Sequence, residues 1–252
     1  MKIALLGYGK MGKAVEKIAL AKNHEIVYKV DLENAYDFMP VSLHNVDVAI
    51  DFSMPSSAVD NINKCFDAGV PIVVGTTGWY DRFDEIKQRC INEKHAMVYS
   101  TNFSIGVNLF FKLNKILAQM MKHFNDYEVA IEEVHHTQKK DHPSGTALTL
   151  SKSIMENFLE KTEIKSRLIF DPNSPLQSGK PNELVIDCYR EGDVTGIHKV
   201  VYKSMIDTIS IKHEANSRYG FAKGALMAAE WIIGKNGIYN MDDILKLDEI
   251  IK

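Results

Sequence analysis

The sequence predicts an α/β protein in which a doubly wound parallel sheet is interrupted by a second, α+β domain. Three observations predict it. Strand and helix signals alternate up to about residue 99, three strand signals follow one another between residues 183 and 213 without a helix, and an apolar helix comes last. We place the first domain at residues 1–104 plus 217–252 and the inserted domain at residues 105–216.

In the first domain, short apolar runs alternate with stretches of helical periodicity, which is typical of βαβ units. The segment from Leu32 to Asn45 is too irregular for a helix, with Pro40 inside it, and is expected to cross as a loop. The expected strands are 2–6, 25–30, 46–51, 70–74 and 95–99, and the expected helices are one that follows the glycine motif ending at residue 12, then 55–67 and 81–93.

The inserted domain is expected to begin with a long helix and to continue as a strand, a histidine-rich loop and a second helix. Strands without helices between them suggest antiparallel pairing. The final helix is apolar on much of its surface and is expected to pack back on the first sheet. The expected elements are the helix 106–123, the strand 126–134, the helix from Ser144, a Pro/Ser/Asn-rich excursion at 171–182, the strands 183–190, 196–202 and 208–213, and the helix 218–233.

A glycine motif follows the first strand and opens the first helix. Gly7-Tyr8-Gly9-Lys10-Met11-Gly12 has the spacing and the context of a dinucleotide-binding turn, so the first domain is predicted to be Rossmann-like. Asp31 ends the second strand, where a carboxylate can bind the adenosine ribose hydroxyls. Leu32, rather than an arginine, follows it, which favours NADH, while Lys10 and Lys29 keep NADPH open.

Two other strands of the first domain end in polar turns. Gly75-Thr76-Thr77 and Ser100-Thr101-Asn102-Phe103 are expected at the carboxyl edge of the sheet, where open α/β sheets bind ligands.

The histidine-rich loop joins possible proton donors to a possible anion site. His135, His136 and Lys139 precede Ser144, which opens a helix whose free N–H groups suit a carboxylate or phosphate. Gly145 allows the ligand to approach the backbone closely, and Thr146 adds a hydroxyl donor.

Two plainer interpretations of this loop compete with an anion site. Ser144 could be an ordinary N-cap, and a zinc site could be built from His135, His136, His142, Glu132, Glu133 and Asp141. No HExxH or cysteine pair supports zinc, so no metal is expected.

Composition excludes other classes of protein. The net charge of −3 argues against a nucleic-acid binder, and no apolar run is long enough to cross a membrane. The three cysteines are widely spaced, which is typical of reduced thiols in a cytoplasmic protein.

Taken together, the motifs resemble those of the dihydrodipicolinate reductase family. The resemblance rests on the glycine motif, on Gly75-Thr76-Thr77-Gly78, Asn102-Phe103-Ser104-x-Gly106-Val107-Asn108 and Gly192-Asp193-x-x-Gly196-x-His198, and above all on the block from His135 to Ala147. It implies reduction of a cyclic imine dicarboxylate, 4-hydroxy-tetrahydrodipicolinate, by NADH or NADPH in the lysine and diaminopimelate pathway. It also implies a homotetramer assembled through the substrate domains.

The resemblance implies roles for individual residues. His135 is similar to the family's catalytic histidine and Lys139 to its catalytic lysine, while His136, Gly145 and Thr146 match substrate-binding positions. The segments that match cofactor-contacting positions are Gly7 to Gly12, Asp31, Gly75 to Thr77 and Ser100 to Phe103. The chain departs from the family at Thr137, where members often have arginine, and after Asp31, where they often have a basic residue.

Two alternatives to this reductase remain at the level of sequence. One is a non-catalytic module that senses NAD(H), which would not need proton donors beside an anion-binding helix. The other is an amino-acid dehydrogenase of similar fold, which the Lys139 to Thr146 arrangement disfavours.

Overall fold

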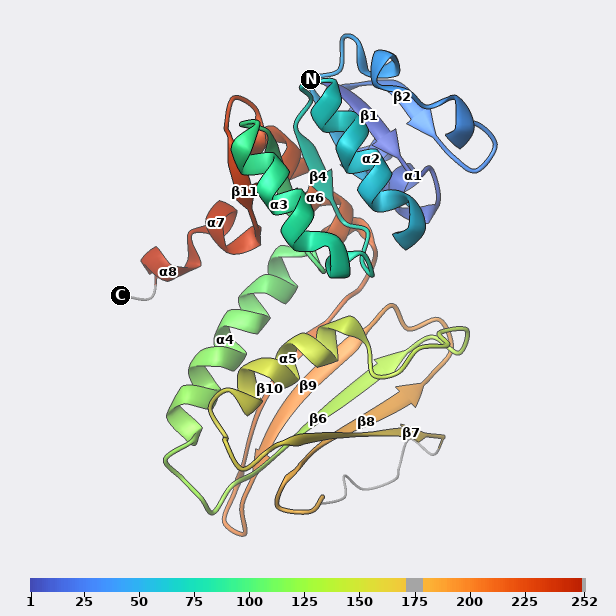
Figure 1. Cartoon of the computed structure of the whole chain (residues 1–252). Coiled ribbons are helices and arrows are strands. Elements are labelled where there is room, and N and C mark those ends of the chain that lie inside the picture. Colours follow the sequence, from blue (N-terminus) through green and yellow to red (C-terminus); the bar gives the residue numbers. More distant parts are fainter. Residues whose placement is uncertain (171–178, 251–252) are drawn as a thin grey trace. The chain divides into compact units, whose positions relative to one another are not determined.

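The computed structural model of the chain describes residues 1–170 and 179–250 (Figure 1). The chain divides into two compact units, of which unit 1 comprises Met1–Ile105 and the segment from Arg218 onward, and unit 2 comprises Gly106–Ser217. Most of the excursion expected at 171–182 lies outside the described residues. No helix in the described ranges is long and apolar enough to span a membrane.

Unit 1 is built on a six-stranded sheet in which every pair of neighbours is parallel, in the order β11-β5-β4-β3-β1-β2. The chain goes from β1 to β2 on one side and then returns to the other side of β1 with β3. Ligands bind at such a switch point, beyond the carboxyl ends of the strands. The strands are β1 (Lys2–Leu6), β2 (Glu25–Val30), β3 (Val48–Asp51), β4 (Ile72–Val74), β5 (Ala96–Tyr99) and β11 (Gly237–Tyr239).

Helices cover both faces of this sheet, which confirms the doubly wound fold (Figure 1). Ile3 and Leu5 of β1 pack with α1 (Lys10–Ala21) and α6 (Tyr219–Ile232). Their neighbours Ala4 and Leu6 point to the other face, in the cluster that includes α2 (Pro55–Asp67) and α3 (Phe83–Asn92). Burial on both faces explains why the strands are continuous apolar runs.

The connection from Leu32 to Asn45 contains two 3₁₀ turns, η1 (Ala35–Asp37) and η2 (Pro40–Leu43), rather than an α-helix. A further 3₁₀ turn, η3 (Tyr80–Arg82), precedes α3. The short elements β11, α7 (Met241–Leu245) and α8 (Leu247–Ile250) were not expected, because each is too short to show a period in the sequence.

Unit 2 has a five-stranded mixed sheet in the order β10-β9-β6-β8-β7. One face packs on α4 (Ile105–Met121) and α5 (Gly145–Met155), which bury a single apolar cluster with it. The strands are β6 (Glu128–His135), β7 (Glu163–Ile169), β8 (Glu183–Arg190), β9 (Ile197–Lys203) and β10 (Thr208–Glu214).

The expected antiparallel pairing is confirmed for β9, which pairs with β6 and β10 in that sense, and is wrong for β8. β8 lies between β6 and β7 and runs parallel to both. Between β6 and β8 the chain passes through α5, which supplies the crossover that a parallel pair needs. Strand β7 was not expected at all.

Candidate active site

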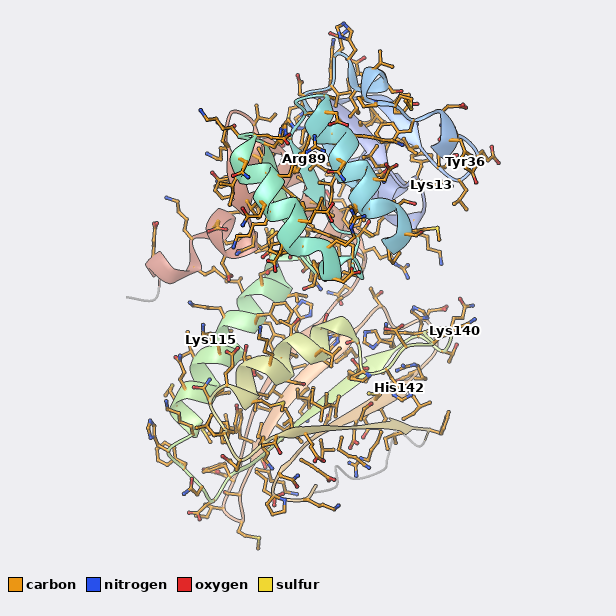
Figure 2. The ribbon with its side chains drawn as sticks, viewed as in Figure 1. Lys13, Tyr36, Arg89, Lys115, Lys140 and His142 are labelled. Atoms are coloured by element: carbon orange, nitrogen blue, oxygen red, sulfur yellow. The ribbon has the colours of Figure 1, made fainter. Side chains whose placement is uncertain are left out.

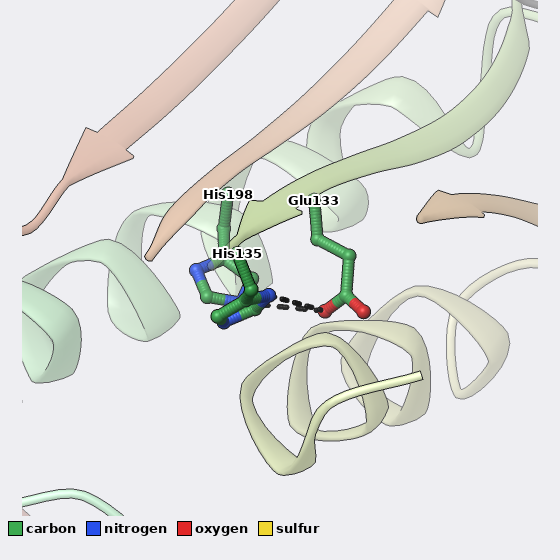
Figure 3. A group of neighbouring side chains, drawn as sticks. All are labelled: Glu133, His135 and His198. Carbon is green, nitrogen blue, oxygen red and sulfur yellow. Dashed lines mark ion pairs between the residues drawn. The ribbon is translucent and has the colours of Figure 1, made fainter. Parts of the chain in front are cut away.

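The candidate active site of unit 2 is a buried cluster of one carboxylate and two imidazoles, shown in Figure 3. Glu133 and His135 are two residues apart on β6, so both point to the face that packs on the helices. His198 lies directly opposite Glu133 on β9. Strand β6 extends to His135, one residue beyond the expected end, which holds this side chain on the sheet instead of in the loop.

The Glu133 carboxylate is fully buried and ionised. It accepts the backbone N–H of Ser144 at 3.1 and 3.2 Å, and one of its oxygens lies 3.5 Å from Nε2 of His198. Burial alone would raise the pKa of Glu133, but the hydrogen bonds from His198 and Ser144 prevail and lower that pKa to about 2.

The His135 imidazole is nearly buried, and its Nδ1 has no hydrogen-bond partner. The nearest carboxylate oxygen, Oε2 of Glu133, is 3.8 Å from Nδ1, and the ring of His198 is 5.0 Å away between centroids. Burial lowers the pKa of His135 to about 4, against the opposing effect of Glu133, so the ring is neutral at neutral pH.

Ser144 is the N-cap of α5, and both its backbone N–H and its hydroxyl group have partners inside the protein. Its N–H binds Glu133, while Oγ accepts the N–H of Ala147 at 3.2 Å and lies 3.0 Å from Nε2 of His198. The anion site predicted at this helix start therefore rests on Gly145 and Thr146. A Cβ on Gly145 would meet nothing within 4 Å, so the backbone there is open to a ligand.

The loop between β6 and α5 carries Lys139. Its ammonium lies 2.6 Å from Asp141, and the side chain is 19% exposed. Arg190 of β8 holds this loop by donating to the backbone carbonyls of Lys139 at 3.0 Å and Asp141 at 2.9 Å. The charges of Lys139 and Arg190 both add to the effect of burial in lowering the pKa of His135.

Other side chains of this loop are more exposed than the buried cluster. Lys140 is exposed and His142 bonds Ser166 of β7 at 3.1 Å, and both project from the loop (Figure 2). His136 is half-buried, and its carbonyl accepts the N–H of Lys139. The structure therefore brings His135 and the start of α5 together in the core and leaves the other loop residues at its rim.

Glu133, His135 and His198 also form the one group of three potential metal ligands within the described residues, with donor atoms inside 4.8 Å of one another. Two of its three members already have protein partners, because Glu133 accepts from Ser144 and His198 bonds the hydroxyl of Ser144. The geometry favours a hydrogen-bonded cluster over chelation.

In unit 1, the glycine motif forms the turn between β1 and α1. Gly7 has a φ of +93°, and a Cβ there would lie 2.3 Å from the carbonyl oxygen of Phe52. A Cβ on Gly12 would lie 2.4 Å from the carbonyl oxygen of Gly7. Gly9 differs, because a Cβ there would meet nothing within 4 Å, and no side chain caps the helix that follows it. These features fit a pyrophosphate bound on the start of α1.

This geometry predicts that one valine substitution weakens NADH binding and that another lowers thermal stability. Gly9→Val is expected to weaken NADH binding at least about tenfold, because its side chain occupies the space of the pyrophosphate, with little change in Tm. Gly12→Val is expected to lower Tm, because its Cβ clashes with backbone. Fluorescence titration with NADH and thermal melting measure both, and equal NADH affinity of Gly9→Val and wild type would contradict the prediction.

The second expected cofactor position, Asp31, is exposed at the end of β2 and accepts the N–H groups of Glu33 and Asn34. Lys29, considered above as a cation for NADPH, is paired with Glu16 at 2.5 Å. The hydroxyl of Tyr8 donates to the other oxygen of Glu16. Lys10 remains the exposed cation of the glycine motif.

The other expected cofactor residues follow β4 and β5, but two of their side chains face inward. Thr76 donates to the buried carboxylate of Asp51 at 2.5 Å, and Phe103 belongs to the core that packs on α6. Contact with a cofactor at these two positions would therefore involve the backbone. Gly75 and Thr77 flank Thr76, and Ser100, Thr101 and Asn102 form a partly exposed turn in which Oγ of Ser100 donates to the carbonyl of Asn102.

Sequence reasoning gave no catalytic role to Glu133, His198 or Arg190. Glu133 was considered only as a zinc ligand, and His198 only as the last residue of one of the motifs that carry the family resemblance. The spacing of Glu133 and His135 on one strand was the available signal, because it puts both on the same face. Nothing local in the sequence shows that β9 lies beside β6.

Comparison with known proteins shows to which family the chain belongs. The N-terminal domain of dihydrodipicolinate reductase matches residues 1–103, and the C-terminal domain of the same enzyme matches residues 106–245. The chain belongs to the dihydrodipicolinate reductase family. The family block from His135 to Ala147 thus encloses the β6 end, the Lys139 loop and the start of α5 described above.

Individual members of the dihydrodipicolinate reductase family are similar over nearly the whole chain. A 4-hydroxy-tetrahydrodipicolinate reductase of Christiangramia forsetii is 46% identical over 249 residues, which are 97% of this chain and 98% of that protein. One of Methanosarcina barkeri is 38% identical over 242 residues, covering 95% and 83%. The structure of dipicolinate-bound dihydrodipicolinate reductase from Paenisporosarcina sp. TG-14 shares the fold, with a TM-score of 0.73 at 20% identity over 95% of this chain and 97% of that one.

Proposed function

We infer that the chain reduces 4-hydroxy-tetrahydrodipicolinate to tetrahydrodipicolinate with NADH or NADPH, in lysine and diaminopimelate biosynthesis. The reaction takes up one hydride and one proton and releases the 4-hydroxyl group as water. The observation that carries the inference is the buried cluster of Glu133, His135 and His198 set against the start of α5. Within this family, an anion site beside proton-carrying groups fits an anionic substrate that must gain a proton.

Unit 1 is the proposed dinucleotide-binding domain. A bound nicotinamide cofactor supplies the hydride. The N–H groups at the start of α1 bind its pyrophosphate, Gly9 lets that group approach the backbone, and Asp31 accepts hydrogen bonds from the adenosine ribose.

Unit 2 is the proposed substrate-binding domain, and its cations and free N–H groups suit the two substrate carboxylates. Gly145 and Thr146 bind one carboxylate at the start of α5, where the helix dipole favours negative charge. His136, together with Lys139 or Lys140, binds the other from the loop. Thr137 cannot replace the charge of the arginine that family members often have there.

Lys139 and His135 are proposed to handle the proton. Loss of the 4-hydroxyl group and a proton from the neighbouring carbon as water gives a conjugated imine. Hydride addition to this imine leaves an enamine that must be protonated, and an ammonium group can donate a proton directly. Lys139 is such a group and is held by Asp141 and, through its carbonyl, by Arg190. His135 is neutral, so it serves as a hydrogen-bonding and orienting group beside the donor.

We further propose that the chain acts in the cytoplasm as a homotetramer joined through unit 2. All three cysteines are free and buried, as expected of a protein from a reducing compartment. At the turn between β9 and β10, Met205 and Ile206 expose almost their whole side chains, which suits contact with another copy of the chain. Sedimentation equilibrium of the purified protein tests the number of subunits.

The function itself is tested by mixing the purified protein with NADH or NADPH and the imine dicarboxylate, and following the nicotinamide absorbance. We expect oxidation of the cofactor that depends on both components, with one cofactor oxidised per product formed. Binding of NADH without turnover would instead favour an NAD(H)-sensing module. Turnover with an amino acid and NAD⁺, but not with the imine, would favour an amino-acid dehydrogenase.

A further inference from the structure

Glu133 is a carboxylate in the apolar layer between the sheet of unit 2 and its helices. Removing a carboxylate from water costs several kcal/mol unless other groups bind it. The groups around this one include the N–H of Ser144 at 3.1 and 3.2 Å, Nε2 of His198 at 3.5 Å, Nδ1 of His135 at 3.8 Å, and the thiol of Cys188 on β8, which hydrogen-bonds to it. Ser144, His198 and His135 belong to or adjoin the site proposed above, so the buried charge is connected to that site.

The first connection runs through the start of α5. Glu133 holds the N–H of Ser144, and His198 lies within hydrogen-bond distance of the Ser144 hydroxyl, which itself caps the helix. The residue that opens α5 is therefore fixed on both its backbone and its side chain. The next two residues, Gly145 and Thr146, carry the N–H groups that we assign to a substrate carboxylate, so their positions depend on this anchor.

The second connection runs to His135. Its Nδ1 is buried without a partner, and in the cluster the closest acceptor is Oε2 of Glu133 (Figure 3). A neutral imidazole carries one proton, and a carboxylate beside one nitrogen favours the form with the proton on that nitrogen. With the proton on Nδ1, Nε2 presents a lone pair. A Cβ on Gly196 would lie 3.3 Å from Nε2, so the glycine leaves this nitrogen uncovered on that side.

We propose that Glu133 is a positioning residue for the reduction: it fixes the start of α5 through Ser144 and sets the orientation and tautomer of His135 through the negative charge that it places 3.8 Å from Nδ1. His198 supports it from β9 by binding both Glu133 and the hydroxyl of Ser144. The inference rests on the function proposed above. It assigns no contact between Glu133 and the substrate.

The test uses Glu133→Gln in the full-length protein, with Glu132→Gln as the matched control. Glutamine keeps the shape and one oxygen for the N–H of Ser144 but loses the charge. Glu132 is the preceding residue on the same strand, points to the opposite face and pairs with Lys199 at 3.4 Å. Steady-state kinetics, the solvent hydrogen isotope effect on kcat, NADH affinity and Tm are measured for wild type and both variants.

We expect Glu133→Gln to lower kcat between about tenfold and 100-fold, with NADH affinity changed less than twofold. The solvent isotope effect on kcat is expected to rise, because a misoriented His135 slows proton transfer relative to hydride transfer. Glu132→Gln is expected to match wild type in all four measurements. A Glu133→Gln variant with lowered Tm but unchanged kcat and isotope effect would show that the residue is only structural and would overturn the inference.

Should Glu133→Gln fail to fold, His198→Gln is measured in the same way, since it removes the imidazole that braces Glu133 and leaves the Ser144 contact to the carboxylate. The same loss of kcat with a raised isotope effect is expected, to a smaller extent, and wild-type values would reject the inference. Absence of activity in the wild-type protein would instead reject the proposed function, so the two failures are distinguishable.

Discussion

Lys139→Ala is expected to lower kcat for the imine dicarboxylate by about 10²-fold to 10⁴-fold, the usual contribution of a positioned proton donor. Alanine removes the ammonium group and its pair with Asp141 while leaving the backbone carbonyl that Arg190 binds. The dissociation constant of NADH is expected to stay within about twofold of wild type, because the glycine motif and Asp31 are unchanged. Single-turnover kinetics with saturating NADH measure the chemical step.

Two controls make the Lys139 result specific. Lys152→Ala removes an exposed lysine from the last turn of α5 and is expected to leave the rate unchanged. A small primary amine added to Lys139→Ala is expected to restore part of the lost rate, since it can donate the missing proton. An unchanged chemical step in Lys139→Ala would remove this residue from the mechanism, whatever its effect on substrate binding.

Unit 2 is expected to lose stability as the pH falls from about 6.5 to 4. The pKa of His135 is lowered by burial from 6.5 to about 4, so in this range the unfolded chain binds a proton that the folded unit does not. Stability then falls with falling pH, by up to about 3 kcal/mol for a shift of this size. Glu133, whose pKa is lowered from 4.5 to about 2, acts in the same direction at still lower pH.

Hydrogen exchange of the β6 and β9 amides measures this loss of stability in unit 2. Tryptophan fluorescence would not, because both tryptophans, Trp79 and Trp231, lie in unit 1 and report on that unit. The substitution His135→Gln is expected to weaken the dependence of the stability of unit 2 on pH between pH 6.5 and pH 4. Part of it should remain, since burial also lowers the pKa of His213 on β10. The same slope in His135→Gln and wild type would show that the buried imidazole does not account for the acid sensitivity.

The sequence was a good guide to unit 1, because its signals are local. The apolar runs, the glycine turn and the long amphipathic helices are each specified within a few residues, and β1, β2 and α2 begin and end where expected. Strand β7 gave no such signal. Its residues Glu163 and Lys165 are exposed on an edge strand, so the strand shows no continuous apolar run in the sequence.

In unit 2, the parts that sequence reasoning missed depend on contacts between distant segments. The side chain of Asp187 is buried, and Arg167 of β7 binds both of its oxygens at 2.7 and 2.8 Å, which fixes β7 beside β8. His198 enters the site only because β9 pairs with β6. The motif that predicted Ser144 as an anion-binding residue did not show that Glu133 and His198 already bind its N–H and its hydroxyl group.

Unit 1 is built from two separate segments of the chain, so its core can be completed only late in synthesis. Helix α6 buries Ala222, Ala225 and Ala229 against strands that come early in the chain. During synthesis, β1 to β5 therefore emerge with only α1 to cover the sheet face on which α6 later packs. The whole of unit 2 follows before α6 can complete the core. Unit 2 is contiguous, so it can fold while the earlier strands still expose apolar surface. A chaperone that binds nascent chains would accordingly find its target in the first hundred or so residues, until translation passes α6.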